Sequence, residues 1–422
     1  MAQKKLTSIT DMTDFKYPLD YAIASIGGTL GKISGDALKD YYVGLSDGSG
    51  AETAIARSEA AAVAISEAQD TLDAAAEAIG AEDEEDMEDI IAYAGVHTDG
   101  SNLIANAWME RLGYGCLIFT TTEENEEVRI IARSEFLSAM YIDGKEIDLS
   151  DLESASETFS GSSTTITDYP YSHTFEEAGE HAVWIKIDTT QASLTALFYN
   201  CTAMTEVKVS PFRLCTATTN FSSTFRYCTG LVTIPSGMFD YCTSATTFSQ
   251  CFLGCYALQE IPDGLFDNNL AVTSFSNCFQ ECYSLTSIPD GLFAVHEKVT
   301  AWRYLFNQCY SLPRIASDAN ISLTSDIERL FNGCSAAEVI TFTGLGTQES
   351  CTMTDAFYNC TLWGSTDEGL ESLVDSLLTN SFDRATAGYD ALTITLPSAV
   401  YARLSDDEVN SIVAKGFTLT TE

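Results

Sequence analysis

The chain has 422 residues, of which 45% are hydrophobic and 11% aromatic, so it is long enough for several modules and too apolar for wholesale disorder. Its 61 acidic and 21 basic residues give a formal net charge of -40, which repels phosphate backbones and argues against nucleic-acid binding. No segment approaches the roughly 18 consecutive apolar residues that a membrane span needs, so we expect no membrane insertion.

Residues 1–50 form a short module that ends in a Gly/Ser linker at 46–50. Its start has two lysines but no continuous apolar stretch, so nothing in it addresses the chain for secretion. Lys32-Ile33-Ser34, followed by Leu38, resembles the K-I-S-x-x-x-L element that precedes an Ala-rich coiled coil in the virion-anchoring segment of Bacteroides-phage fibre proteins. This resemblance implies that the module anchors the chain to a virus particle.

Residues 51–92 are expected to form a helical coiled coil. From 51 to 79 the sequence is rich in Ala, Glu, Ile and Leu and has no Pro or internal Gly, which predicts one long helix. Three large residues lie seven apart, each four positions after an alanine, and this oligomerisation seam comprises Ala61, Ile65, Ala68, Leu72, Ala75 and Ile79. A parallel homotrimer is favoured by analogy with fibres; the alternative is an amphipathic helix packed on its own domain.

The segment 82–89 carries seven acids in eight positions. A solvated face is favoured there over a calcium site, because the spacing of an EF-hand is absent.

Residues 93–190 predict a small β-rich domain. The strand signals are β-branched and aromatic runs, which occur at 116–119, 128–131, 141–147, 171–175 and 182–187. Asp143-Gly144 is typical of a hairpin turn, and the last two runs, joined through Ala178-Gly179-Glu180, predict a second hairpin.

The segment 191–366 is an internal repeat built on the pattern Phe-x-x-Cys. Successive phenylalanines lie 27, 27, 27, 27, 25 and 26 residues apart, and they are Phe198, Phe225, Phe252, Phe279, Phe306, Phe331 and Phe357. Large apolar residues also recur four positions before each Phe, and Leu and Ile recur after most of the cysteines. A period in the twenties predicts stacked repeats, each of which buries its apolar residues against its neighbours.

The pattern F-x-x-C-x-x-L-x-x-I-P resembles the BspA-like leucine-rich repeats of surface proteins of gut Bacteroidetes and of their phages, including fibre and spike proteins of crAss-like phages. The resemblance covers about 190–365 and implies a leucine-rich-repeat solenoid of seven coils that binds protein or glycan. The last repeat departs from the pattern, since Trp363 and Thr366 replace the Leu and Ile.

Residues 367–422 predict an α/β cap. Ser365 with Glu368, and Ser405 with Glu408, match capping boxes that begin helices, and strands are expected at 392–396 and 417–419. The predicted fold class is therefore multidomain α+β: an anchor and coiled coil, a small β domain, and a C-terminal solenoid with its cap.

The sequence offers no convincing catalytic or metal site. Gly31-Lys32 lacks the flanking residues of a phosphate loop, and His296-Glu297 lacks the second histidine of a metalloprotease motif. A zinc site is conceivable from one repeat-spaced set, Cys251, Cys255, Cys278 and Cys282. Because that spacing equals the repeat period, stacked and reduced core cysteines are favoured, and we expect no metal, no cofactor and no enzymatic activity.

The candidate ligand surface follows from residues at equal phase. Tyr256, Tyr283 and Tyr310 each follow the repeated Cys and predict an aromatic stripe, whereas the plainer alternative is that they shield the turns. Further candidate contacts are Gln259, Glu260 and Arg314.

These features favour a phage virion structural protein, a head or tail fibre or spike. Its expected partners are other virion proteins through the N-terminus, further copies of itself, and a host cell-surface protein or glycan. The expected location is the virion surface after synthesis in the host cytoplasm. The alternative is a BspA-like adhesin on a bacterial cell surface, and an enzyme with a repeat appendage is disfavoured.

Overall fold

The computed structural model describes residues 23–26, 29–32, 109, 112–143, 145–149, 155–158, 165–168, 170–324 and 326–421. The chain divides into two compact parts, the first comprising Met1–Val96 with Asn102–Trp108 and the second His97–Ser101 with Met109–Glu422. In the first part the described residues form one antiparallel hairpin, β1 (Ile23–Ile26) with β2 (Thr29–Lys32). These strands flank Gly27-Gly28, a dipeptide typical of hairpin turns.

The predicted fold class is wrong. The described residues are mostly β, with 25% in strands and 11% in helices, and they contain only four α-helices. They form neither a coiled coil nor a leucine-rich-repeat solenoid, because the repeats consist of turns and isolated bridges in place of one regular strand and helix each. The segment 51–92 and all six residues of the predicted seam lie outside the described residues.

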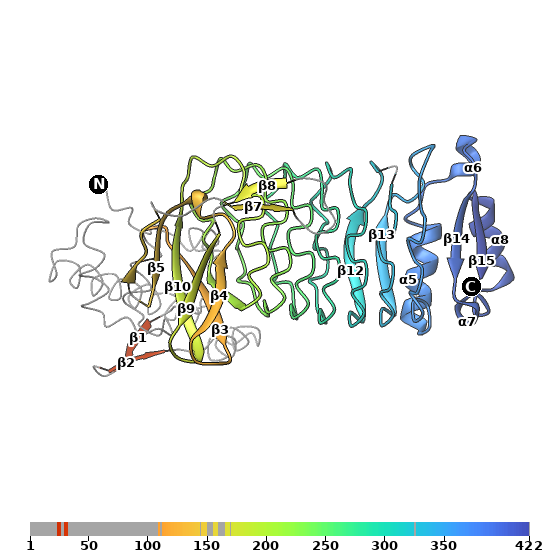
Figure 1. Cartoon of the computed structure of the whole chain (residues 1–422). Helices are drawn as coiled ribbons and strands as arrows, with labels where there is room; N and C mark the ends of the chain where they lie inside the picture. The colour runs from red at the N-terminus through yellow and green to blue at the C-terminus, as the bar shows by residue number, and fades with distance from the viewer. Residues whose placement is uncertain are drawn as a thin grey trace. The chain divides into compact units, whose positions relative to one another are not determined.

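The second part begins with a β layer (Figure 1). A five-stranded sheet has the order β11-β3-β10-β5-β6, formed by Met204–Val209, Gly115–Thr121, Gly179–Ile187, Leu137–Ile142 and Lys145–Glu146. A 3-10 helix, Ser134–Phe136, precedes β5. Two antiparallel pairs complete the layer: β4 (Glu126–Ile131) with β9 (Tyr171–Phe175), and β7 (Ala155–Thr158) with β8 (Thr165–Asp168).

The hairpin predicted between 171–175 and 182–187 does not form. β9 pairs with β4, whereas β10 pairs on one side with β3 and on the other with β5. The reason lies in burial: β10 is buried along most of its length and occupies the centre of its sheet, while β9 alternates between half-buried and exposed residues and buries only Phe175.

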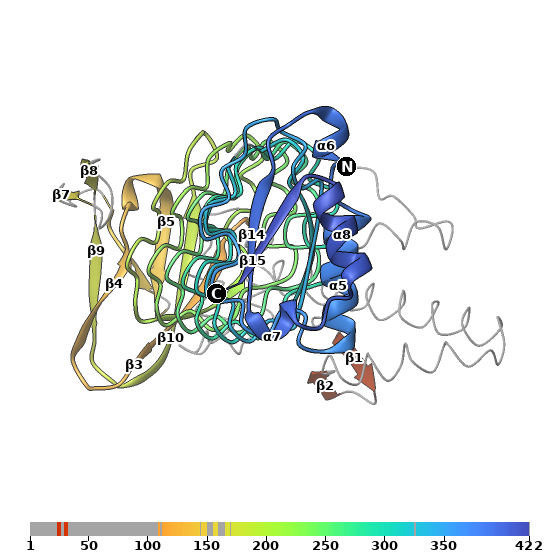
Figure 2. The same cartoon turned by 90° about the vertical axis from the view of Figure 1, so that its right-hand side faces the viewer.

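The repeats follow this layer and lie over one another in register. Isolated parallel bridges join equivalent positions, from Ser193 to Asn220, Thr247, Ser274 and Ala301 in turn. In Figure 2 successive turns of the chain accordingly overlie one another. Regular strands appear only at β11, which joins the five-stranded sheet, and at the parallel pair β12 (Arg314–Asn320) and β13 (Val339–Thr343).

Every repeat uses two residues with positive φ, one two positions before its Phe and one two positions after it. Their φ values lie between 52° and 77°, in the left-handed region that most side chains avoid. The first column is Ala196, Ser223, Gln250, Asn277, Tyr304, Arg329 and Asp355, and the second is Asn200, Tyr227, Gly254, Glu281, Gln308, Gly333 and Asn359. Because only two of the fourteen are glycine, this conformation could not be predicted from the residue types.

The core is one continuous cluster from the β layer to the C-terminal cap. Its axis is a column of stacked rings: Phe225 and Phe252 have centroids 5.4 Å apart, Phe252 and Phe279 5.5 Å, and Phe279 and Phe306 5.8 Å, all within 10° of parallel. All four rings are fully buried. The repeated Phe is thus the residue through which each repeat packs on the next.

A small α/β cap follows the last repeat. It contains α5 (Asp367–Leu378), α6 (Arg384–Ala387), α7 (Ser398–Tyr401) and α8 (Asp406–Ala414), with β14 (Leu392–Leu396) parallel to β15 (Phe417–Thr421). The capping box of Ser405 and Glu408 is confirmed at α8. The box predicted at Ser365 is wrong, because Thr366 caps α5 by accepting a hydrogen bond from the Gly369 N–H.

Phe279→Ala is expected to lower the free energy of unfolding by about 3–5 kcal/mol, because it removes a fully buried ring that stacks on both neighbours. Urea unfolding of the full chain, followed by circular dichroism, measures the loss. Leu270→Ala is the control, since Leu270 is 53% exposed and its truncation should cost less than about 0.5 kcal/mol. Equal effects of the two changes would contradict the ring column.

Gly254→Ala should destabilise more than Gly264→Ala. Both glycines have positive φ, but a Cβ on Gly254 would lie 2.2 Å from the Tyr227 ring, whereas on Gly264 its nearest neighbour is 3.5 Å away. We expect about 1 kcal/mol for Gly264→Ala from the backbone alone and about 1–3 kcal/mol more for Gly254→Ala from overpacking. Thermal melts of the two variants give the comparison, and the reverse order would refute the close approach of Tyr227.

Candidate functional site

The three predicted tyrosines form a continuous row along the repeats. Tyr256 and Tyr283 stack with centroids 4.8 Å apart and planes at 14°, and Tyr283 and Tyr310 stack at 5.4 Å and 19°. Tyr256 is 36% and Tyr310 45% exposed. The row exists because each tyrosine directly follows the buried Cys of its repeat, at the same phase in register.

Stacking decides what this tyrosine row can offer a ligand. The faces of Tyr283 are covered by its two neighbours, so the row presents ring edges and hydroxyl groups rather than an open aromatic platform. Burial, and then the nearby Glu281 carboxylate, raise the pKa of Tyr283 to about 12. The hydroxyl is therefore protonated at neutral pH and is available both to donate and to accept hydrogen bonds.

The surroundings of the row are acidic. Between Arg226 and Lys298 the sequence has no Lys or Arg but seven acids, which are Asp240, Glu260, Asp263, Asp267, Glu281, Asp290 and Glu297. Glu281 faces the row closely enough to raise the pKa of both Tyr256 and Tyr283. An anionic ligand would meet repulsion here, whereas a neutral or cationic one would not.

The other candidate contacts occupy a neighbouring segment of the repeats. Gln259 and Glu260 are exposed, and Glu260 forms a parallel bridge with Ser287 of the next repeat. Arg314, at the start of β12, is held in ion pairs with Asp290, at 3.4 Å, and with Glu368 of the cap. It therefore ties the repeats to the cap, and a ligand would have to compete with these carboxylates.

The repeated cysteines have a structural role that the sequence did not reveal. Each thiol donates to the carbonyl of the phenylalanine in the preceding repeat: Cys228 to Phe198 at 3.0 Å, Cys255 to Phe225 at 3.2 Å, and so on through the stack. The remaining members of the series are Cys282, Cys309, Cys334 and Cys360. Cysteine suits this position because it is small and apolar, and because its thiol is a weak donor that can satisfy a carbonyl buried among closely packed side chains.

The same burial weakens the case for zinc. None of the thirteen cysteines forms a disulfide, and the four of the conceivable zinc set are fully buried. Burial raises the pKa of Cys255, Cys278 and Cys282 well above its ordinary value, so the thiolates that zinc requires are costly to form. Among the residues that the structure describes, no group of three or more His, Cys, Asp or Glu side chains is arranged to hold a metal ion.

One polar cluster was missed from the sequence. His181 is only 6% exposed, its Nε2 lies 3.1 Å from the Thr121 hydroxyl, and its Nδ1 lies 3.9 Å from Asp143. The Thr121 hydroxyl also accepts from the Gly179 N–H and lies near the Glu177 carbonyl, and the His181 ring stacks on Phe175 at 3.8 Å. Because Thr121 and His181 are both buried, the cluster closes the turn between β9 and β10 and exposes no reactive group.

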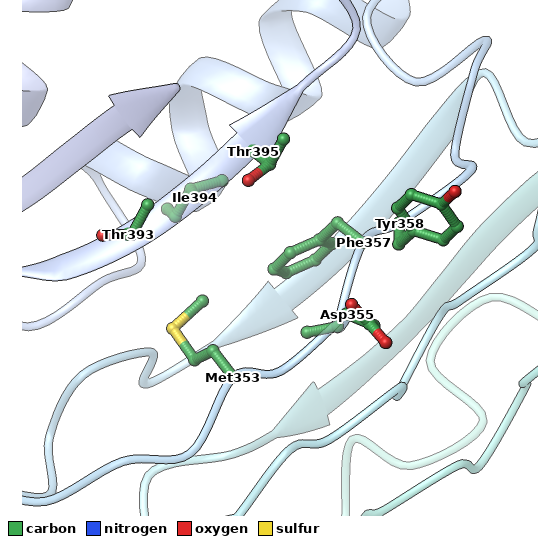
Figure 3. Close-up of a pocket in the computed structure, with 8 residues that line it drawn as sticks. Met353, Asp355, Phe357, Tyr358, Thr393, Ile394 and Thr395 are labelled. Carbon is green, nitrogen blue, oxygen red and sulfur yellow. The ribbon is translucent and has the colours of Figure 1, made fainter. Parts of the chain in front are cut away.

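A pocket of about 240 Å³ lies where the repeats meet the cap (Figure 3). One wall is the last repeat and the other is β14, and the lining residues are Met353, Asp355, Ala356, Phe357, Tyr358, Thr393, Ile394 and Thr395. The floor is apolar, since Phe357 and Ile394 are buried, while the rim is polar. This site could not be predicted from the sequence, because its two walls lie more than thirty residues apart in the chain.

A scan against protein-family models finds no match to this chain, and a search of curated proteins finds none either. No helix in the described ranges is both long and apolar enough to cross a membrane.

The buried thiols should be unreactive in the folded protein. Cys351 is the only half-buried one, so alkylation with iodoacetamide near neutral pH should modify it first, and the other twelve only on unfolding. Mass spectrometry of the intact chain counts the modified sites. Rapid labelling of Cys255 or Cys282 in the native state would contradict their place in the core.

The same burial makes stability depend on alkaline pH. Folding raises the pKa of thiols such as Cys309, from 9.0 to about 12, so above pH 9 the unfolded chain releases protons that the folded chain retains. This stabilisation is complete below pH 9 and is lost as the pH rises towards 12, and urea midpoints across that range should fall accordingly.

Proposed function

We propose that this chain is a non-enzymatic attachment protein, a fibre or spike component of a phage virion, which presents its repeats to a host surface. The observation that carries the proposal is the tyrosine row, in which two exposed side chains and one half-buried side chain lie at equal phase over a continuous buried core. The resemblance of the Phe-x-x-Cys pattern to BspA-like repeats supports the same role. Such a surface offers many weak, repeated contacts rather than one deep catalytic site.

The chemistry of the tyrosine row limits the classes of ligand that we propose for it. With the ring faces covered, recognition would rest on hydroxyl groups, on Gln259 and on acids such as Glu260 and Glu281. The absence of Lys and Arg between Arg226 and Lys298 favours a neutral glycan or a basic protein surface over an acidic polysaccharide.

Attachment to the particle is assigned, in this proposal, to residues 1–50, and self-association is proposed alongside it. Both assignments rest on the sequence alone, because residues 51–92 and most of residues 1–50 lie outside the described ranges. The expected location is the virion surface. Proteomic analysis of purified particles and of bacterial outer membranes separates this proposal from the surface adhesin, since recovery only in membranes would overturn it.

Replacing Tyr256, Tyr283 and Tyr310 together by Phe should weaken binding of the purified chain to intact Bacteroides cells by about tenfold or more. The change removes the three hydroxyls of the row but keeps the stacked rings, so the fold is preserved. Flow cytometry with the labelled protein measures the binding.

Tyr241→Phe is the matched control, because Tyr241 is 38% exposed but lies outside the row. Binding that is unchanged by the triple substitution would exclude the tyrosine row as the contact surface. Loss of binding at high salt would indicate a basic partner, and salt-independent binding a neutral glycan.

A further inference from the structure

Along the Phe-x-x-Cys segment, the backbone hydrogen bonds between repeats all run in one direction, whereas other segments, such as the one with the Thr246 N–H and the Thr219 carbonyl, donate the opposite way. The Phe225 N–H donates to the Cys251 carbonyl at 2.8 Å, and the Phe252 N–H donates to the Cys278 carbonyl at 2.9 Å. The pattern continues to the last pair of repeats, where the Phe331 N–H donates to the Ala356 carbonyl at 2.9 Å. Along this segment each repeat therefore presents donors to the repeat that follows it and acceptors to the one before.

This polarity comes from the two positive-φ positions of each repeat. Alternating left-handed and right-handed residues turn alternate N–H groups to the same side of the chain, a geometry that elsewhere forms binding sites for electron-rich atoms. The last repeat has the same conformation, with φ of 55° at Asp355 and 60° at Asn359. Its alternate N–H groups therefore point the same way as those of the repeats before it.

No repeat follows to accept these hydrogen bonds. In the described chain, the N–H groups of Met353, Asp355 and Phe357 have no acceptor, although their counterparts Ile327, Arg329 and Phe331 donate to Thr352, Thr354 and Ala356. All three residues line the pocket against the cap. A row of unused donors therefore forms one of its walls.

The opposite wall is also an unpaired edge. The Leu392 N–H donates to the Gly416 carbonyl, so the peptide groups of residue 392 point towards β15. Since alternate residues of a strand point the same way, the peptide groups of residues 394 and 396 also point towards β15. The peptide groups of Thr393 and Thr395 then point away from β15, on the edge that lines the pocket. Figure 3 shows Thr393 to Thr395 running in the same direction as Met353 to Tyr358.

We propose that this pocket binds an extended peptide segment of a partner protein, inserted as the missing rung between the last repeat and β14. The carbonyls of the peptide would accept from the N–H groups of Met353, Asp355 and Phe357, and its other edge would pair with Thr393 and Thr395. The occupant would thus continue a hydrogen-bonded ladder that already joins all seven repeats.

The charges at the site favour a peptide over an anion, although both could accept from a row of N–H groups. The Asp355 carboxylate lies on the rim, where it pairs with Arg329 at 3.2 Å, and the whole chain carries a formal net charge of -40. Neutral carbonyl oxygens meet no such repulsion. The buried Phe357 and Ile394 at the floor favour small or β-branched apolar side chains on the inward face of the peptide.

The test uses the full-length chain and a fluorescein-labelled, end-capped heptapeptide of alternating valine and threonine, with binding followed by anisotropy. Thr395→Pro removes an outward N–H of β14 and the hydroxyl contact with Thr420 at 2.9 Å, but none of the backbone hydrogen bonds between β14 and β15, and proline is tolerated at such edges. We expect saturable binding that weakens by about tenfold or more in Thr395→Pro.

Thr421→Pro is the matched control, since the same pairing phase turns the N–H of residue 421 away from β14, on the far edge of the same sheet. It should change the affinity by less than about twofold. Equal affinity for Thr395→Pro and the wild-type chain, or no binding by the wild-type chain, would overturn the proposal.

A second arm keeps the test valid should Thr395→Pro fail to fold, as judged by circular dichroism. Here the wild-type chain is titrated with heptapeptides N-methylated at alternate residues, in the two possible phases. One phase should abolish binding and the other should spare it, because only one edge of the peptide gives N–H groups to β14. Identical affinities in both phases, or displacement of the peptide by millimolar inorganic phosphate, would refute insertion of a strand.

Discussion

The structure depends on the contact that each repeat makes with the next. At that contact a phenylalanine stacks on its equivalent, its N–H donates to the following repeat, and its carbonyl accepts from the thiol of the following repeat. One residue is thereby packed and fully hydrogen-bonded in the dry interior, where an unpaired backbone group would cost about 1–3 kcal/mol. The Phe-x-x-Cys spacing recurs in the sequence because each repeat makes this contact with the next.

The same contact determines the surface. Since the core holds equivalent residues in register, any exposed position repeats along the stack at the spacing of the rings, as Tyr256, Tyr283 and Tyr310 do. A row of this kind suits a partner that offers many similar contacts, and the acids around it exclude strongly anionic partners. The proposed attachment role therefore follows from regularity and charge, without any reactive group.

The backbone hydrogen bonds of the Phe-x-x-Cys segments all run from one repeat to the next, so the first and the last repeat are left with different unpaired groups. At the first repeat the β layer supplies what a preceding repeat would: the Ala132 N–H donates to Leu197, and the Cys201 thiol donates to Ile130 of β4. At the last repeat the cap covers the core but leaves the donors of Met353, Asp355 and Phe357 without partners. This asymmetry is why the proposed peptide site lies at the cap.

The sequence by itself determined the repeat, its register, the core positions and most strands, because burial imposes a period that single residues reveal. Strand 116–119, the box at Ser405 and the equal phase of the three tyrosines are examples. Only the tertiary structure decided the fold class, the pairing of β9 with β4, and the pocket. The physical reason is that the fold class, the strand pairing and the pocket depend on backbone conformation and on which strand edges remain unpaired. Left-handed residues as unlike as Tyr227, Glu281 and Gln308 carry no common side-chain signal, so the conformation that replaces a regular strand and helix could not be read from them.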